Sequence, residues 1–299
     1  MDRRQPILAN KYERMTSEEL EQYAEEHGAE VFRKVKLSDA VEIRGSGLPN
    51  ALFDYASRAH LDFVIANEES YPQFAVEFDG PHHQSDPDAQ ERDRKKNAVC
   101  RRLGLPLIRI RREHLEEVGI GEEVEIKNPL GSMLYGHYSS TIGWLTDLWF
   151  TREAFFEAQE RGELRPRAVW SWNFIGGCDP TVGLHSYILT LHKRGILPNR
   201  RPTEYIARFD FEHSKALTEI PLPGGKIICG QSECETVGYY QDPFPQDIAR
   251  VTSLNRAVKN LSGHLSGEKE PKSRGEVERT LSQMRSDVDG DLTVLNGRA

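Results

Sequence analysis

The sequence predicts an α/β domain with a mixed sheet flanked by helices, followed by a second, α+β part. The first prediction comes from the order of the elements before residue 127, which is helix, three strands, helix, strand. The prediction of a second part comes from a change of amino-acid composition, since all four tryptophans follow residue 128. We place the two domains at 1–127 and 128–262, and we expect a polar, flexible tail over 263–299.

The first helix and strand are predicted at 16–27 and 31–37. Thr16 or Ser17 supplies a helix cap, and the acidic residues after them favour the first helical turn. The run VFRKVKL is typical of a strand. The following stretch EIRGSGLPN contains glycine and proline and is predicted to be a loop.

Two further strands, at 60–66 and 73–79, are close enough in sequence to form a hairpin. A helix follows, with Asp86 as its cap, Pro87 at its first position and Gly104 as its terminating residue. The run LPLIRI after it predicts a short buried strand over 105–110, and 112–118 is predicted to be helical.

The second part has helical texture over 152–161 and 183–194 and strand texture over 207–211 and 226–229. Within the tail, a short helix is predicted over 276–285. Aromatic richness favours a core, with a base-stacking surface as the alternative. We expect this part to recognise nucleic acid or to bind a partner, either another protein or a second copy of the chain.

Composition limits the class of protein. The net charge of −8 argues against a chain that coats nucleic acid along its whole surface. No apolar run has the length of a membrane span, and MDRRQPILAN lacks the apolar stretch of a secretory signal. We therefore expect a cytoplasmic protein with no membrane partner.

The four cysteines do not predict a disulfide framework. Cys100 fits a buried position in a helix. Cys178, Cys229 and Cys234 stand near two histidines, which leaves a zinc site open, but no C-x-x-C pair occurs. Ordinary thiols are the favoured interpretation.

A basic segment interrupts the acidic chain between residues 92 and 112. Its cations are Arg92, Arg94, Lys95, Lys96, Arg101, Arg102, Arg109, Arg111 and Arg112, against the single acid Asp93. A charge run alone is typical of a solvated helix face. Beside an acidic cluster, however, it is what a phosphodiester-cutting site needs.

That acidic cluster is predicted from Asp62, Glu77 and Asp79. Alternate side chains of a strand share a face, so Glu77 and Asp79 point the same way, and hairpin pairing brings Asp62 close to Glu77. Carboxylates held together need compensation, and Mg²⁺ or Mn²⁺ provides it. The alternative is that these acids are solvated at strand ends.

The next helix supplies cations toward this cluster. At about 100° per residue, Arg92 and Lys96 fall on the same stripe as Val99 and Leu103, which face the sheet. Cations on a buried stripe need an anionic partner, such as the carboxylate cluster or a phosphate that it holds. An ordinary structural salt bridge is the alternative.

The stretches HLDFVIAN, FAVEFDGPHHQ and ERDRKKNAVCRRLGLPLIRI, in this order, resemble the PD-(D/E)XK or restriction-endonuclease-like superfamily. The similarity covers residues 16–112 and is greatest to the branch of very-short-patch-repair endonucleases. The matching positions are Asp62, Phe63, Val64, Glu77, Phe78, Asp79, Gly80, His83, Asp93, Lys96, Gly104 and Arg109.

The resemblance implies Mg²⁺-dependent cleavage of DNA, with Asp62 and Glu77 as metal ligands. Asp79 stands where many members have the catalytic lysine, and we expect Lys96 to replace that lysine while Asp79 joins the metal ligands. His82 or, by its spacing from Gly80, His83 is expected as the acid or base. Either Glu21 or Glu25 from the first helix is expected to complete the site.

The sequence therefore predicts a metal-dependent endonuclease, with the branch suggesting bacterial restriction, repair or phage defence. DNA is the expected partner, with RNA left open. The predicted nucleic-acid contacts are Arg92, Lys95, Arg109 and Arg111. Two alternatives stay open: a catalytically inactive nuclease fold that only binds nucleic acid or a partner, and a subunit whose second half mediates assembly.

Overall fold

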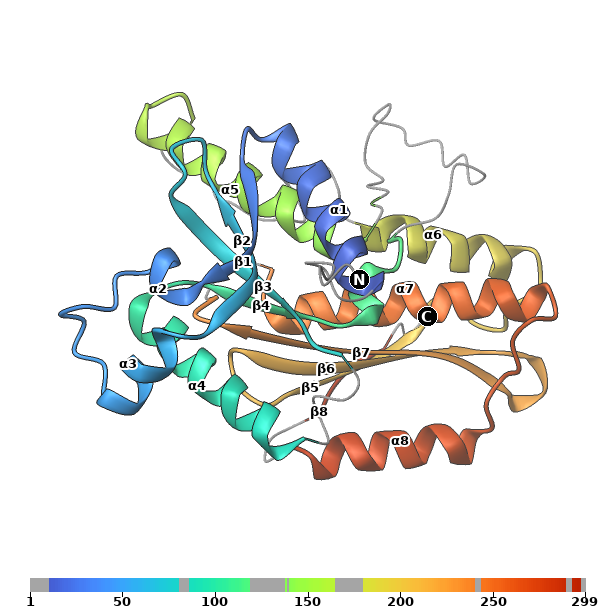
Figure 1. Cartoon of the computed structure of the whole chain (residues 1–299). Coiled ribbons are helices and arrows are strands. Elements are labelled where there is room, and N and C mark those ends of the chain that lie inside the picture. Colours follow the sequence, from blue (N-terminus) through green and yellow to red (C-terminus); the bar gives the residue numbers. More distant parts are fainter. Residues whose placement is uncertain are drawn as a thin grey trace, which may run out of the picture. The chain divides into compact units, whose positions relative to one another are not determined.

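In the computed structural model, the strands form one mixed eight-stranded sheet in the order β1-β2-β3-β4-β7-β6-β5-β8 (Figure 1). The structure describes residues 11–80, 86–118, 138, 140–164, 180–239, 243–288 and 292–296. Helices flank the sheet, so the predicted α/β class with a mixed sheet is confirmed. None of the helices in these ranges combines the length and the apolar character needed to cross a membrane.

Apart from two single 3₁₀ turns, the described elements are helices and strands. The helices are α1 (Lys11–Glu26), α2 (Leu37–Ala40), α3 (Asn50–Ala56), α4 (Pro87–Leu103), α5 (Thr141–Glu160), α6 (Pro180–Lys193), α7 (Pro245–Leu265) and α8 (Arg274–Ser286). The strands are β1 (Glu30–Lys36), β2 (His60–Ala66), β3 (Pro72–Phe78), β4 (Leu107–Ile110), β5 (Thr203–Arg208), β6 (His213–Pro221), β7 (Ile227–Val237) and β8 (Leu292–Asn296).

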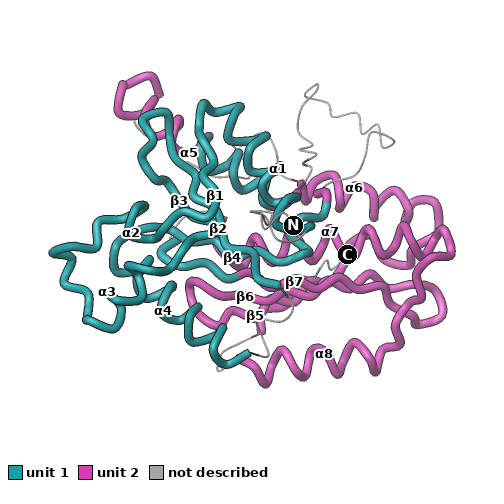
Figure 2. The backbone as a smooth tube through the Cα atoms, viewed as in Figure 1, with its two compact units in different colours: residues 1–116, 142–150, 235–239 teal, residues 117–141, 151–234, 240–299 magenta. Residues whose placement is uncertain are grey.

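The chain divides into two compact units (Figure 2). Unit 1 contains residues 1–116, together with the later segments Ile142–Phe150 and Glu235–Tyr239. Unit 2 contains residues 117–141, 151–234 and 240–299. Unit 1 overlaps the predicted first domain of residues 1–127 but ends at Glu116, and it adds a piece of α5 and the last residues of β7 from later in the sequence.

Within unit 1, β1, β2 and β3 are antiparallel, and β3 pairs in parallel with β4. The predicted hairpin between β2 and β3 is confirmed, and it aligns Phe63 with Val76. The last residues of β7 add an antiparallel neighbour to β4, with Arg109 opposite Glu235. The element order that the sequence predicts up to residue 110 is therefore present, with the short helices α2 and α3 added.

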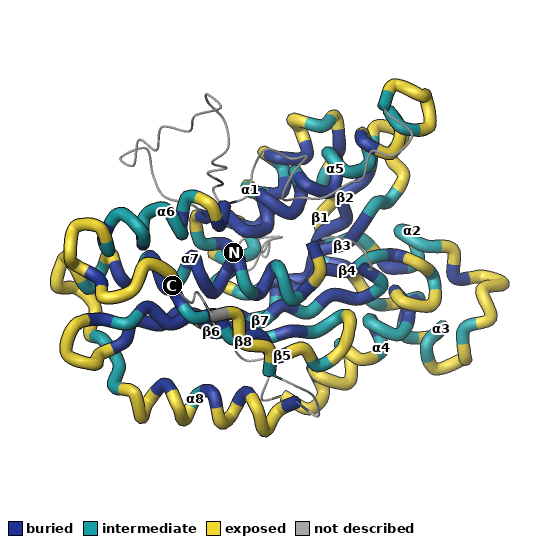
Figure 3. Tube along the Cα trace, turned by 180° about the vertical axis from the view of Figure 1, so that it is seen from behind, coloured by how far each residue is buried: buried dark blue, intermediate teal, exposed yellow. Residues whose placement is uncertain are grey.

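Side chains of β3 alternate between the two faces of the sheet in unit 1, and each face packs against different helices. The ring of Phe74 packs at 4.8 Å against Trp149 of α5, and Phe78 stacks at 5.4 Å on Tyr12 of α1. On the other face, Ala75 joins a buried cluster with Val99 of α4. Figure 3 shows β2, β3 and β4 as mostly buried. Burial on both faces explains the nearly continuous apolar sequence of these strands.

The ends of α4 match the sequence prediction. The Asp86 side chain accepts a hydrogen bond from the Asp88 amide at 3.0 Å, and Pro87 occupies the first turn. Gly104 ends the helix in the left-handed region at φ 72°, a conformation that favours glycine. These two caps fix where α4 begins and ends, and so fix the positions of the side chains that it directs toward the sheet.

Unit 2 has one apolar core on each face of its strands. Helices α6 and α7 supply Leu184, Ile188, Leu254 and Leu261 to the first core. The second core is covered by α8, which contributes Val277, Leu281 and Met284 to a cluster with Leu217 and Cys229. Strand β6, which the sequence analysis missed, runs between these layers and pairs with β5 over six residue positions.

The segment after residue 262 differs from the expected flexible tail. Ser262 still lies in α7, the predicted helix over 276–285 is present as α8, and β8 pairs with β5. Apolar residues at Val277, Leu281 and Met284 recur at helical spacing and reach the core, although the segment is polar on average. Composition alone hid this single buried stripe.

Candidate acidic site between two strands

Two carboxylates bridge β2 and β3 at the end of the hairpin ladder. The backbone amide of Asp62 donates to Oε1 of Glu77 at 3.0 Å, and the amide of Phe78 donates to Oδ2 of Asp62 at 3.1 Å. The regular pairing recorded for these strands begins one residue further on, at Phe63 and Val76. Each carboxylate therefore accepts a backbone amide from the opposite strand, and the two acids are held next to each other, as predicted.

Lys96 of α4 contacts the same pair. Its Nζ atom lies 2.6 Å from Oε2 of Glu77, and both residues are buried, with 9% of Lys96 and 6% of Glu77 exposed. The prediction that Lys96 faces the sheet is thus confirmed. Val99 and Cys100 continue the buried side of α4.

Glu77 is electrostatically unusual. Burial is the largest cause that raises its pKa, to about 7, and the neighbouring Asp62 adds to this shift, whereas Lys96 acts in the opposite direction. One ammonium group therefore does not fully compensate the buried carboxyl. A second cation at this pair would stabilise the ionised form of Glu77.

A second lysine holds Asp62. Nζ of Lys34 lies 2.7 Å from Oδ1 of Asp62 and 3.3 Å from Oε1 of Glu13 on α1. Lys34 has a positive φ of 53°, an uncommon conformation for a non-glycine residue that is often found at functional sites. Burial lowers its pKa, but hydrogen bonds and charge from Asp62 and Glu13 outweigh this and raise the pKa overall.

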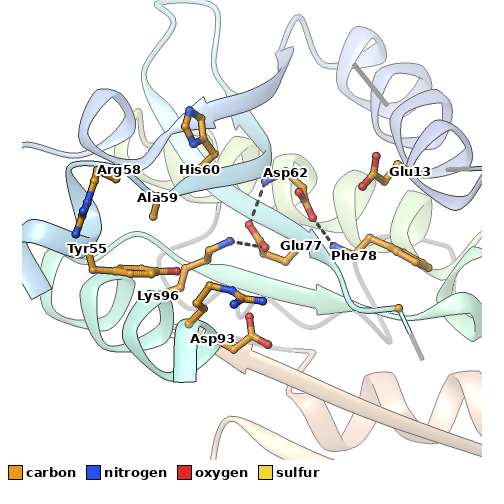
Figure 4. Close-up of a pocket in the computed structure, with 12 residues that line it drawn as sticks. Glu13, Tyr55, Arg58, Ala59, His60, Asp62, Glu77, Phe78, Asp93 and Lys96 are labelled. Atoms are coloured by element: carbon orange, nitrogen blue, oxygen red, sulfur yellow. Dashed lines mark hydrogen bonds and ion pairs between the residues drawn. The ribbon is translucent and has the colours of Figure 1, made fainter. Parts of the chain in front are cut away.

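The acid pair opens onto a cavity of about 660 Å³ (Figure 4). Its ionisable lining consists of Glu13, Tyr55, Arg58, His60, Asp62, Glu77, Arg92, Asp93 and Lys96. Arg58, His60 and Arg92 are exposed, while Glu77 and Lys96 lie at the buried end. Burial is the main cause that raises the pKa of Tyr55 to about 12, with the charge of Glu77 adding to it, so its hydroxyl stays protonated at neutral pH.

Asp79 does not join the acid pair, contrary to its predicted role as a metal ligand. Its Oδ1 atom lies 2.8 Å from Nη1 of Arg109 in a separate cluster with Asp93 and Glu235. Asp79 and Glu77 do lie on the same face of the sheet, the face that α4 covers, as the alternation of the strand predicts. Arg109 draws it away, because this guanidinium is buried and needs anionic partners.

The prediction that Arg109 contacts nucleic acid is wrong. Only 2% of it is exposed, and Asn97 also accepts from its Nη2 at 2.8 Å. Although burial opposes the charged form, Asp79, Asp93 and Glu235 raise the pKa of Arg109. This residue therefore ties together β3, α4 and the end of β7 as a structural ion cluster.

The remaining predicted residues are distributed around the cavity. Arg92 is exposed, not buried with Lys96 as its stripe suggested, and it lines the cavity. Lys95 pairs with Glu91 at 3.5 Å on the solvent side of α4. Arg111 is half-buried beyond the end of β4. His82 and His83 lie outside the described residues.

Several cavity residues were missed by the sequence analysis. Glu13 takes the place expected of Glu21 or Glu25, and Glu21 pairs instead with Arg33. The helix was predicted to begin at Thr16, which excluded Glu13, whereas α1 includes Lys11. Tyr55, Arg58 and His60 stand around the end of α3, and the position of His60 two residues before Asp62 in β2 was the one available signal.

The donor set is compatible with Mg²⁺ or Mn²⁺. Asp62 and Glu77 offer hard carboxylate oxygens, and Mg²⁺ is commonly held by one or two carboxylates, with water and substrate phosphate completing its shell. Among the described residues, no three acids, histidines or cysteines gather into a ready-made metal cluster. The fit is therefore that of a two-carboxylate site that shares its ion with substrate.

Residues 4–125 match a family described as Protein of unknown function (DUF2726). This similarity covers less than half of the chain and includes every residue of the acid pair and its cavity. Neither a curated protein nor a solved structure matches the chain.

Proposed function

We propose that unit 1 is a restriction-endonuclease-like nuclease that hydrolyses DNA phosphodiester bonds with Mg²⁺ or Mn²⁺. The observation that carries this proposal is the interlocked pair Asp62 and Glu77, with Lys96 at 2.6 Å from Glu77. The element order around the pair, helix, three strands, helix, strand, supports the finer fold assignment.

The acid pair suits a divalent ion because it combines adjacent carboxylates with burial. Burial makes the ionised form of Glu77 costly, and the adjacent Asp62 adds to this cost, so the pKa of Glu77 is raised to about 7. When bound, a divalent ion polarises a phosphate oxygen and makes a water molecule more acidic. Asp62 and Glu77 are the residues that would hold it.

Lys96 supplies the cationic group beside the pair. Asp79 stands in the strand where similar nucleases have a lysine, and Lys96 of α4 would take the role of that lysine. The Asp86 cap fixes the start of α4. An ammonium group there orients the attacking water and balances the negative charge that grows on the phosphate. Hydrolysis adds this water across one P–O bond, and the leaving oxygen ends with a proton.

The rim of the cavity supports a polyanionic substrate. Arg58 and Arg92 are exposed there, and cations so placed contact phosphates beside the one that is cut. His60 is also exposed at the rim and has the chemistry of a proton donor for the leaving oxygen. Because these groups contact the backbone and not the bases, RNA stays open as a substrate.

A cleavage assay on the full chain tests the proposal. Supercoiled plasmid, single-stranded DNA and RNA are each incubated with Mg²⁺, Mn²⁺ or EDTA. We expect metal-dependent cleavage by the wild type and a loss of at least ~100-fold in Glu77→Ala. Glu69→Ala is the matched control, because this exposed acid lies at the other end of the β2–β3 hairpin. Equal cleavage by the two variants would overturn the proposal.

A second candidate is a catalytically inactive nuclease fold that only binds nucleic acid. It is favoured by one observation: all four oxygens of the pair already accept from the protein, through Lys34, Lys96 and two backbone amides. The same assay separates the candidates. DNA binding without any metal-dependent cleavage would support the inactive fold.

A further inference from the structure

Unit 2 has a cavity of its own, with a volume of about 410 Å³. It lies between the first two turns of α6, the start of β5 and the edge strand β8. Glu204 and Leu295 pair directly across β5 and β8, so their side chains share the face that carries this cavity. None of these residues takes part in the acidic site of unit 1.

The buried end of the cavity is an organised charge cluster. Glu204 is only 4% exposed, and its two oxygens bind different partners. Oε1 contacts Nε2 of His185 at 3.1 Å, and Oε2 accepts from Nε of Arg250. Burial raises the pKa of Glu204, but these two partners lower it below its usual value overall. The carboxylate thus stays charged and fixes the two donors in place.

Arg250 is held through its Nε atom, and within the described part of the chain its two Nη atoms keep their donors for another acceptor. A second guanidinium, that of Arg201, is exposed and lines the same cavity. Thr181 and Ser186 add hydroxyl groups from α6. With two arginines against one acid, the polar lining of the cavity is net cationic and rich in donors, which is the chemistry that binds phosphate.

Part of the cavity wall is apolar. It is formed by Val182, Pro202 and Leu295. Val182 and Leu295 are 38% and 42% exposed, which makes them two of the large apolar side chains that the described chain leaves in water. A cavity lined by both cationic groups and an apolar wall matches a ligand that has both a phosphate and a flat apolar ring.

We propose that this cavity binds the phosphate of a nucleotide, with Arg201 and Arg250 on the phosphate and Val182, Pro202 and Leu295 against the base. The nucleotide is either a free nucleoside monophosphate or the 5′-phosphorylated end of a strand, which present the same group. Glu204 is a positioning residue, since it acts by holding Arg250 and His185.

Calorimetric titration of the full chain tests this site. Adenosine monophosphate, inorganic phosphate and short single-stranded DNA with a 5′-phosphate or a 5′-hydroxyl are titrated in EDTA, so that cleavage at the acidic site does not interfere. We expect adenosine monophosphate to bind more tightly than inorganic phosphate because of the apolar wall. Between the two DNAs, we expect the 5′-phosphate to bind more tightly.

Arg201→Gln is the decisive variant, because the residue is exposed and its loss leaves no buried charge behind. We expect its affinity for adenosine monophosphate to fall by at least ~10-fold. Arg200→Gln is the matched control, an exposed neighbour outside the cavity lining, and it is expected to bind like the wild type. Circular dichroism melting confirms that both variants are folded.

The arms also identify the source of the phosphate. Tighter binding of the 5′-phosphorylated DNA than of the mononucleotide assigns the site to strand ends, and the reverse order assigns it to free nucleotides. The proposal is overturned if adenosine monophosphate does not bind, or if Arg201→Gln and Arg200→Gln bind it equally. These titrations measure binding and do not depend on DNA cleavage. A failed nuclease assay therefore leaves the outcome for this cavity undecided by that failure, and the two proposals are tested separately.

Discussion

The amide of Asp62 donates to the side chain of Glu77 at 3.0 Å, so these two acids from neighbouring strands are fixed side by side where the ladder of the hairpin ends. Each of the two side chains thus accepts a backbone amide from the other strand. Changes to either residue therefore affect both the local structure and any cation that the pair binds.

The stability of the metal-free protein is expected to depend on pH through Glu77. Its pKa is raised to about 7 in the folded state, mainly by burial, from an ordinary value of 4.5. Between these values the folded chain keeps a proton that the unfolded chain has released, so the free energy of unfolding falls as pH rises. The slope is at most about 1.4 kcal/mol per pH unit, and it levels off above about pH 7.

Urea unfolding of the wild type and of Glu77→Gln from pH 5 to pH 8, in EDTA, measures this dependence. As pH rises, the unfolding free energy of the wild type should fall relative to that of Glu77→Gln, because glutamine does not titrate. A difference that stays constant over this range would contradict a raised pKa at Glu77.

Lys96→Met is expected to lower the cleavage rate by about 100-fold or more, because it removes the cation that contacts Glu77 at 2.6 Å. Lys193→Met is the matched control, an exposed lysine at the end of α6. Initial rates at saturating DNA, together with DNA affinity, separate a catalytic role from a binding role. Loss of affinity with an unchanged rate would assign Lys96 to binding.

Arg109→Met is expected to destabilise the protein by roughly 3–5 kcal/mol, since it leaves Asp79, Asp93 and Glu235 close together without their buried cation. Arg102→Met, on the exposed side of α4, should change the unfolding free energy by no more than about 0.5 kcal/mol. Urea titrations of both variants provide the comparison. Similar midpoints for the two would show that the Arg109 cluster is not structural.

Gly230→Ala is expected to destabilise unit 2, because a Cβ atom there would lie 2.0 Å from the carbonyl oxygen of Ser253 and 2.3 Å from the amide nitrogen of Ala257. Strand β7 and helix α7 must then move apart, at a cost of roughly 1–3 kcal/mol or more. Gly275→Ala in α8 meets no atom within 4 Å and should stabilise by about 0.5 kcal/mol. Thermal melting distinguishes the two, and equal shifts would contradict the close packing of β7 on α7.

The parts of the fold that were predicted well have strong local signals. The bounds of β2 and α4 follow from an apolar run and from the caps at Asp86 and Gly104. Lys96 could be placed because helical periodicity fixes which side of α4 is buried. The proximity of Asp62 and Glu77 followed from hairpin pairing alone.

The failures concern partners that are distant in sequence. Asp79 and Glu77 share the same side of the sheet, but only the three-dimensional position of Arg109 decides that Asp79 leaves the acid pair. Glu235 reaches that cluster from more than a hundred residues away. The left-handed backbone of Lys34 has no glycine or asparagine to reveal it in the sequence.

Titration of Mn²⁺ into the metal-free chain, followed by calorimetry, tests most directly whether Asp62 and Glu77 share one divalent ion. We predict one binding event per chain for the wild type and for Glu69→Gln, and its loss in Asp62→Asn and in Glu77→Gln. Absence of Mn²⁺ binding to the wild type, or binding that survives in both Asp62→Asn and Glu77→Gln, would contradict the two-carboxylate site.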